Sequence, residues 1–219
     1  MTESLRITDG LAVLEVTGLA PSLVILDAAE KASGVRLLQA ELNDFYGVCM
    51  KLLGDAAALR SAVSRAKRTA EHMGATCVST IIDAPDPRAW SAIESPREYQ
   101  PLIEQDVVFI PNDEASAATR KDEGSTTMAE TTPFAIGLIE TQGFTAVIEA
   151  IDTACKAADV EVIGKEKLGG GYVTILIKGD VAAVKVAVEA GRRRVGDLGK
   201  LIAAHVIPRP SPAVLSLLP

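Results

Sequence analysis

The chain contains the same module twice. When the sequence is shifted by 125 residues against itself, residues 11–85 align with residues 136–210 without a gap, and 19 of the 75 aligned positions are identical. Residues of turns and residues on the faces of predicted helices and strands recur at equivalent positions. A tandem duplication therefore explains the chain better than one large domain does. The identical pairs include Glu15/Glu140, Gly18/Gly143, Asp27/Asp152, Lys31/Lys156, Gly54/Gly179, Asp55/Asp180 and Pro85/Pro210.

The second module has the clearer hydrophobic pattern. A short apolar strand over residues 135–140 and a turn at Gln142 and Gly143 precede a predicted helix, and strands follow at 160–163, 172–178 and 201–207. Asp180 is placed to cap a second helix. The predicted apolar stripe of the first helix is Val147, Ile148, Ile151, Ala154, Cys155 and Ala158, and that of the second is Val181, Val184, Ala187 and Val188.

The first module repeats this order, with strands and helices predicted at 11–16, 21–32, 35–42, 46–53, 55–71 and 75–82. The order β-α-β-β-α-β predicts an α+β fold in which each module is a mainly antiparallel sheet with helices on one face. We expect a first domain at 9–85, an inter-domain arm and mobile linker at 86–133, a second domain at 134–210 and a C-terminal tail at 211–219.

Composition excludes several classes of protein. The formal net charge of −7 argues against a general nucleic-acid partner, and Arg192–Arg194 suit the C-terminus of a helix better than a phosphate-binding patch. No apolar run approaches the about 18 residues that span a bilayer, and no signal peptide is evident, so we expect a cytoplasmic protein without a membrane partner. Cys49, Cys77 and Cys155 lack metal or redox spacing and are expected to be buried free thiols.

The most specific local signal is the string GFTAVIEAIDTACKAADVEVIGKEKLGGGYVTILIKGDVAAVKVAVEAG, followed by HVIPRP at residues 205–210. Its spacing of Asp152, Lys156, Ala158 and Val160, the EKLGGG turn and the IPRP ending resemble the bacterial microcompartment shell protein domain. With the weaker first copy, the chain resembles the unpermuted tandem-domain class of that family. The resemblance implies two ferredoxin-like shell domains per chain and a homotrimer that imitates the hexagonal tile of single-domain relatives.

The resemblance also implies which residues lie at the edges of the tile. Lys156 matches the family's edge lysine, Arg209 matches the arginine that reaches into a neighbouring tile, and Lys31 keeps the edge lysine in the first copy. Ala84 stands where Arg209 has its counterpart, so the first copy is expected to make a weaker or different lateral contact. From the pattern alone, a lysine halfway along a helix is more simply a solvated charge.

Two loops are expected to surround a central pore. Gly169, Gly170 and Gly171 match the family's pore loop, where glycine lets backbone N–H groups face a polar solute. A plain hairpin turn is compatible with this assignment, whereas a phosphate-cradling loop is disfavoured because a strand follows the glycines. The matching loop of the first copy is Asp44, Phe45 and Tyr46, preceded by Asn43. We hypothesise that Asp44 disfavours anions or that Phe45 narrows the channel.

Neither a cofactor nor a metal is expected. Some tandem shell proteins of this kind hold an iron–sulfur cluster through a pore-loop cysteine, but neither loop here contains one. His72 and His205 are not paired with a nucleophile or a ligand set. Glu15 and Glu140 could suggest paired carboxylates for acid–base chemistry, yet duplication explains their equivalence without it. We therefore expect no catalytic residues.

The sequence thus predicts a non-enzymatic shell subunit with a pore for small polar metabolites. Its expected partners are two further copies of itself, other microcompartment shell proteins and enclosed enzymes. The alternative is a trimeric ferredoxin-like regulator that senses a small molecule in an inter-subunit cleft with convergent charges. Assembly separates the two, because a shell subunit should form sheets or tubes whereas a regulator should remain a discrete trimer.

Overall fold

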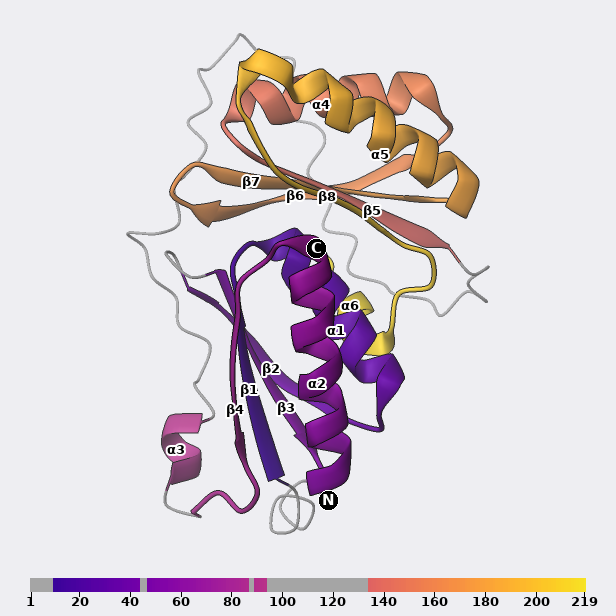
Figure 1. Cartoon of the computed structure of the whole chain (residues 1–219). Coiled ribbons are helices and arrows are strands. Elements are labelled where there is room, and N and C mark those ends of the chain that lie inside the picture. Colours follow the sequence, from indigo (N-terminus) through magenta and orange to yellow (C-terminus); the bar gives the residue numbers. More distant parts are fainter. Residues whose placement is uncertain (1–9, 44–46, 87–88, 94–133) are drawn as a thin grey trace, which may run out of the picture. The chain divides into compact units, whose positions relative to one another are not determined.

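The computed structural model describes residues 10–43, 47–86, 89–93 and 134–219. Asp44, Phe45 and nearly all of the predicted arm and linker lie outside the described residues. The two modules have the same order of elements (Figure 1). The first consists of β1 (Gly10–Val16), α1 (Leu19–Ala32), β2 (Arg36–Asn43), β3 (Gly47–Gly54), α2 (Ala56–Met73) and β4 (Cys77–Ile82). The second consists of β5 (Ala135–Gln142), α4 (Phe144–Ala157), β6 (Glu161–Gly169), β7 (Tyr172–Gly179), α5 (Val181–Val195) and β8 (Lys200–Ile207). Two short helices, α3 (Trp90–Ile93) and α6 (Pro212–Leu215), follow β4 and β8.

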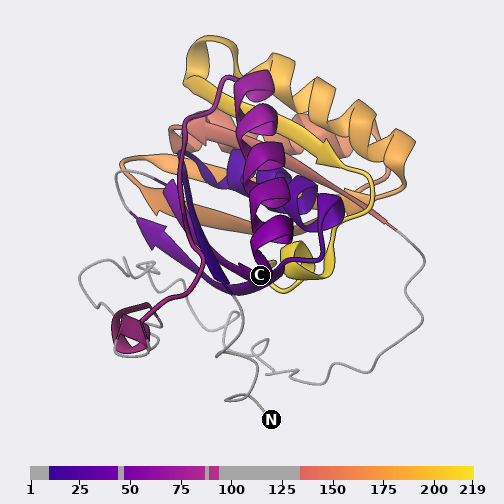
Figure 2. The same ribbon diagram turned by 60° about the horizontal axis from the view of Figure 1, so that its bottom comes forward.

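Both modules form a four-stranded antiparallel sheet, with strand orders β2-β3-β1-β4 and β6-β7-β5-β8. The strand registers also agree, since Glu15 pairs with Cys49 and Glu140 with Thr174, each 125 residues later. The two helices of each module lie side by side on one face of their own sheet (Figures 1 and 2). The predicted α+β fold with two like modules is therefore confirmed.

Short-range signals in the sequence set the helix ends. Asp55 caps α2 by accepting hydrogen bonds from the N–H groups of Ala57 and Ala58 at 2.9 and 2.8 Å, and Asp180 caps α5 through Ala182 at 2.8 Å. The three arginines at 192–194 lie in the last turn of α5, as predicted. None of the helices in the described part of the chain is long and apolar enough to cross a membrane.

Several element boundaries differ from the predictions by one or two residues, and the largest difference is at the end of β6. Strand β6 does not end at residue 163 but continues to Gly169, because its polar second half pairs with β7 along almost the whole of that strand. Helix α1 begins at Leu19, two residues before Pro21. Proline is accepted there because the N–H groups of a first helical turn have no partner within the helix.

The predicted apolar stripe of α4 is wrong in part. The residues that face the core are Ala146, Val147, Ala150 and Ala154, whereas Ile148 is 53% exposed and Cys155 is exposed. The reason is the close packing of α4 on α5. A Cβ atom at Gly191 would lie 2.7 Å from the carbonyl oxygen of Ala150, so small side chains must face this contact and the larger Ile148 is turned outward. Cys49 and Cys77 are half-buried, which also corrects the expectation of buried thiols.

The sheet of the second module is packed on both faces. Its helix-side face, with Ile139 and Ile177, forms a core with α4 and α5. Its opposite face contributes residues to a second core that also contains the helix-side residues of the first module. The residues contributed from that opposite face are Ile136, Leu138, Leu176, Ala203 and Ile207.

Candidate functional site

The two modules contact each other through residues that the structure describes. Helix α1 contacts β5 and β8 in addition to its own sheet. Leu23 of α1 is 1% exposed and shares a core with Ala203 and Ile207 of β8. Burial of large apolar side chains favours such a contact by about 25 cal/mol for each Å² removed from water. The first module therefore docks on the second through one helix.

A buried carboxylate fixes the start of that helix. The carboxylate of Glu140, which is 0% exposed, accepts hydrogen bonds from the backbone N–H groups of Leu19 at 3.0 Å and Ala20 at 3.1 Å. The preceding residue, Gly18, offers no side-chain cap. Burial raises the pKa of Glu140, and the two N–H donors oppose that shift. Glu140 thus serves as the N-terminal cap of a helix in the other module.

The C-terminal segment holds the far side of α1. Asp27 accepts a hydrogen bond from the N–H of Ser211 at 2.9 Å, and Glu30 accepts one from Ala213 at 3.1 Å. Lys31, at the end of α1, bonds to Asp27 at 2.8 Å and donates to the backbone carbonyl of Arg209. The structure therefore brings together two predicted edge residues, Lys31 and the exposed Arg209.

The third predicted edge residue lies apart from these two. Lys156 occupies the last turn of α4, and its side chain is 74% exposed and bonded to Asp152 at 2.5 Å. This hydrogen bond raises the pKa of Lys156. Ala84, the counterpart of Arg209, is exposed. Lys156 thus bonds within its own helix, whereas Lys31 bonds across to the backbone of the other module.

Each half of the intermodule contact has an equivalent that is exposed. Leu19 and Leu23 of α1 correspond to Phe144 and Ile148 of α4, which are 47% and 53% exposed. On the sheet side, the buried Ala203 and Ile207 correspond to Val78 and Ile82, which are 61% and 40% exposed. The sequence alone did not predict which member of each pair is buried. Once one member is known to be buried, the 125-residue offset identifies its exposed equivalent.

The three glycines predicted to border a pore form a tight exposed hairpin between β6 and β7. Gly169, Gly170 and Gly171 have φ values of 81°, 57° and 82°, which side chains rarely tolerate. Two of their carbonyls are held by the first turn of the module, since Gly143 N–H donates to Gly171 at 2.9 Å and the Gln142 amide donates to Gly170 at 3.1 Å. The predicted hairpin turn is present with its glycines in the conformation that requires them.

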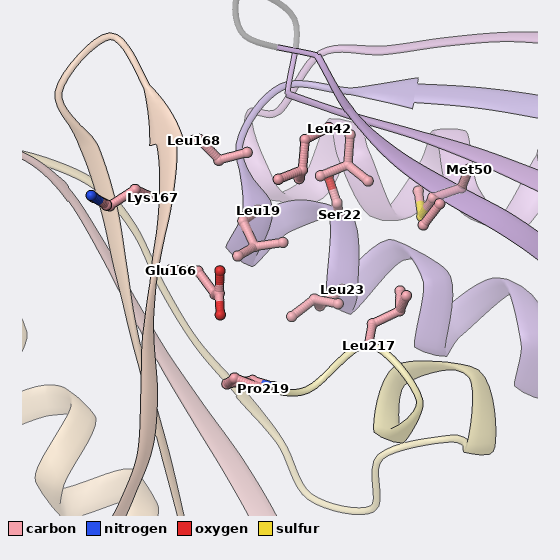
Figure 3. A pocket seen from close by; sticks show the side chains of 12 residues that line it. Leu19, Ser22, Leu23, Leu42, Met50, Glu166, Lys167, Leu168, Leu217 and Pro219 are labelled. Atoms are coloured by element: carbon pink, nitrogen blue, oxygen red, sulfur yellow. The ribbon is translucent and has the colours of Figure 1, made fainter. Parts of the chain in front are cut away.

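A cavity of about 220 Å³ lies between the strands that lead to the two predicted pore loops (Figure 3). Leu42, one residue before the end of β2, and Leu168, one residue before the end of β6, both line it. Asn43, the first predicted pore residue of module one, ends β2 directly after Leu42. The structure therefore brings the bases of the two loops to one place, while Asp44 and Phe45 lie outside the described residues.

The cavity is mainly apolar. Its charged lining residues are Glu166 and Lys167, while leucines from α1, β2, β6 and the C-terminal segment supply much of the remainder. In the described ranges, no group of three or more histidine, cysteine, aspartate or glutamate side chains could hold a metal ion. His72 is exposed in the last turn of α2, and His205 in β8 has a pKa lowered by burial and by Arg192.

In comparisons with known proteins, one family model matches both modules. A family model described as the BMC domain matches residues 10–85 and 135–210. The bacterial microcompartment shell protein PduA of Citrobacter freundii is 48% identical over 85 residues, which cover 39% of this chain and 91% of that protein. The major carboxysome shell protein CsoS1A of Halothiobacillus neapolitanus is 47% identical over 95 residues, covering 42% and 95%. A solved microcompartment protein from Desulfitobacterium hafniense DCB is 27% identical, covers 95% of this chain and 99% of its own, and has a TM-score of 0.37.

Proposed function

Because the chain belongs to the BMC domain family and carries that domain twice in tandem, we propose that it is a structural shell subunit of a bacterial microcompartment. Three chains close into a pseudohexameric ring, and rings tile edge to edge into the facets of the shell. Its location is the shell of a cytoplasmic microcompartment, and its partners are other shell proteins and, on one side, the enclosed enzymes. The relatives PduA and CsoS1A, both shell proteins by name, support this role.

The proposal of a ring depends on the contact between the modules, in which the two contacting surfaces are different. The helix of module one is buried on the sheet of module two, which is a heterologous, head-to-tail contact. Such a contact, when it repeats, generates a ring if its rotation closes and an open filament if it does not; we propose that it closes. The exposed stripe of α4, with Phe144 and Ile148, and the exposed face of β4, with Val78 and Ile82, are the two equivalents that such a repeat would bury. Three chains supply the six modules of a hexagonal tile.

The pore follows from the same closure. The bases of the two loops meet at one cavity, so a ring of three chains would alternate three glycine loops, at Gly169–Gly171, with three loops that carry Asn43, Asp44 and Phe45. Backbone N–H groups and small residues suit the passage of small polar metabolites. The mechanism is containment with selective passage, without catalysis or a bound cofactor.

Tile edges are assigned to Lys31, Lys156 and Arg209. Lys31 and Arg209 lie together at one side of the chain, and Lys156 occupies the equivalent helix position in the second module. Weak contacts of this kind multiply across a layer because every ring repeats them at each edge.

The experiment is to measure the mass of the purified protein in solution and then to examine concentrated samples by electron microscopy. We expect a homotrimer that assembles into sheets, tubes or layered arrays at high concentration. A measured mass of a monomer would contradict the proposed ring. A trimer that never forms layers at any concentration would favour the alternative, a ferredoxin-like regulator.

A further inference from the structure

We propose that Glu15 caps the N-terminus of α4 of the next chain in the ring and so forms the polar anchor of the contact between chains. This inference rests on the proposed ring. The site is incomplete in one chain, because the carboxylate is on module one and the helix start that it would serve is on module two of a neighbour. The partner that Glu15 would contact is a second copy of this chain.

The contact inside the chain provides the template. There, Glu140 on the sheet of one module accepts two hydrogen bonds, at 3.0 and 3.1 Å, from the first N–H groups of α1 in the other module. The first four N–H groups of a helix have no partner within the helix, and a carboxylate is the preferred acceptor for them because it also interacts favourably with the helix dipole.

Glu15 holds the same position on its own sheet. It pairs with Cys49 on β3 and with Val78 on β4, while Glu140 pairs with Thr174 and Ala203, which are the same positions 125 residues later. Side chains directly opposite each other in a sheet point to the same face. Since Ala203 faces α1 inside the chain, Glu15 belongs to the face that carries the exposed Val78.

The helix to be capped is equivalent as well. α4 begins at Phe144 after Gly143, as α1 begins at Leu19 after Gly18, and in both helices the residue before the start offers no side-chain cap. The apolar residues near the start of α1 also have apolar equivalents in α4. Ile148 stands one turn into α4 where Leu23 stands in α1, and it remains 53% exposed.

One position near Glu15 is charged where its equivalent near Glu140 is apolar. Lys51, which occupies the position of Leu176, is buried on this face and bonds to Glu41 at 2.9 Å and to the carbonyl of Ile93 at 2.5 Å. Its ammonium group is therefore engaged by its own acceptors. The contact between chains is expected to be more polar than the contact inside the chain, and thus more dependent on its carboxylate.

The test uses full-length wild type, Glu15→Ala and, as a control for loss of one carboxylate, Glu161→Ala. Glu161 is exposed and bonds to Lys178 at 3.0 Å on another strand. We would measure amide hydrogen exchange of peptides that contain the starts of α4 and α1, and dissociation of the trimer on dilution. In Glu15→Ala we expect faster exchange at Phe144 and Thr145 and about tenfold weaker association per contact, from the loss of a helix cap. Exchange at Leu19 and Ala20 should stay slow, which also shows that the variant is folded.

The outcomes separate the two proposals. If the wild type is not a trimer, the ring fails. If the wild type is a trimer and Glu15→Ala matches it in both exchange at the start of α4 and dissociation, the ring stands and the role of Glu15 is overturned. If Glu161→Ala has the same effects as Glu15→Ala, the effect is one of net charge, and the cap is likewise overturned.

Discussion

The backbone N–H of Leu19 donates a hydrogen bond to a carboxylate oxygen of Glu140 at 3.0 Å, although 121 residues separate them in the sequence. The bond joins the start of a helix in one module to the buried centre of a sheet in the other. Because the acceptor is a carboxyl group that is 0% exposed, removing it would leave two helix N–H groups without a partner in an apolar contact. The two modules are therefore fixed to each other by a polar anchor inside an apolar surface.

A charge on the exposed stripe of α4 should prevent ring formation. Ile148→Glu places a carboxylate where the next chain is expected to bury an apolar side chain, and a buried unpaired charge is costly. Val186→Glu is the matched control, since Val186 on α5 is equally exposed at 53% but corresponds to the exposed Ser61. We expect monomers for Ile148→Glu and trimers for Val186→Glu by light scattering. Trimers in both would show that the contact lies elsewhere.

The stability of the chain should depend on pH through Glu140. Burial raises the native-state pKa of this carboxyl above its ordinary value of 4.5, so the native state binds more protons than the unfolded state in the window just above pH 4.5. Stability from this group is therefore present below pH 4.5 and is lost as the pH rises through the native pKa. Glu140→Gln does not titrate.

Urea unfolding of wild type and Glu140→Gln at a series of pH values from about 4.5 to 8 checks this sign. The free energy of unfolding of the wild type, relative to that of Glu140→Gln, should fall as the pH rises and then level off. A relative stability that increases with pH would mean that the two N–H donors outweigh burial and lower the pKa.

A methyl group at Gly191 should destabilise the second module. Its Cβ would lie 2.6 Å from Cδ1 of Ile139 and 2.7 Å from the carbonyl oxygen of Ala150, and the backbone oxygen cannot move without shifting α4. Overpacking of this kind costs about 1–3 kcal/mol, which we expect for Gly191→Ala in urea unfolding. Gly34→Ala is the control because nothing lies within 4 Å of its Cβ position. Equal stabilities of the two variants would contradict the close contact.

The proposed edge residues Lys156 and Arg209 should affect the assembly of trimers into layers but not the formation of the trimer. Lys156→Ala and Arg209→Ala are each expected to suppress sheets in electron micrographs while the trimer persists in solution, because both side chains are exposed and neither contributes to the apolar contact between modules. Lys185→Ala, which removes an exposed lysine of α5, should leave the sheets intact. Sheets that persist in both edge variants would remove the edge assignment.

The first-copy loop should control what crosses the pore. If Asp44 disfavours anions, Asp44→Ala should increase anion flux through reconstituted tiles, because a like charge at the opening repels them. If Phe45 narrows the channel, Phe45→Gly should increase the flux of larger neutral solutes. Flux that is unchanged in both variants would argue against a role for this loop in selectivity.

Much of each module could be predicted from the sequence because local rules act over a few residues. Alternation and helical spacing located the strands and helices, aspartate at positions 55 and 180 marked two helix starts, and the three glycines marked the hairpin. The 125-residue repeat then established that both modules share one fold. The length of β6 was missed, because its second half is polar and is held by pairing with β7, which no local pattern reports.

The sequence by itself determined the duplication, the order of elements and the matching positions, and it treated Glu15 and Glu140 alike. Only the tertiary structure decided which of the two is buried within the chain and which face of α4 meets the core. The physical reason is that two modules joined head to tail can satisfy a directional contact only once. One helix and one sheet face are therefore covered inside the chain, and their equivalents remain exposed.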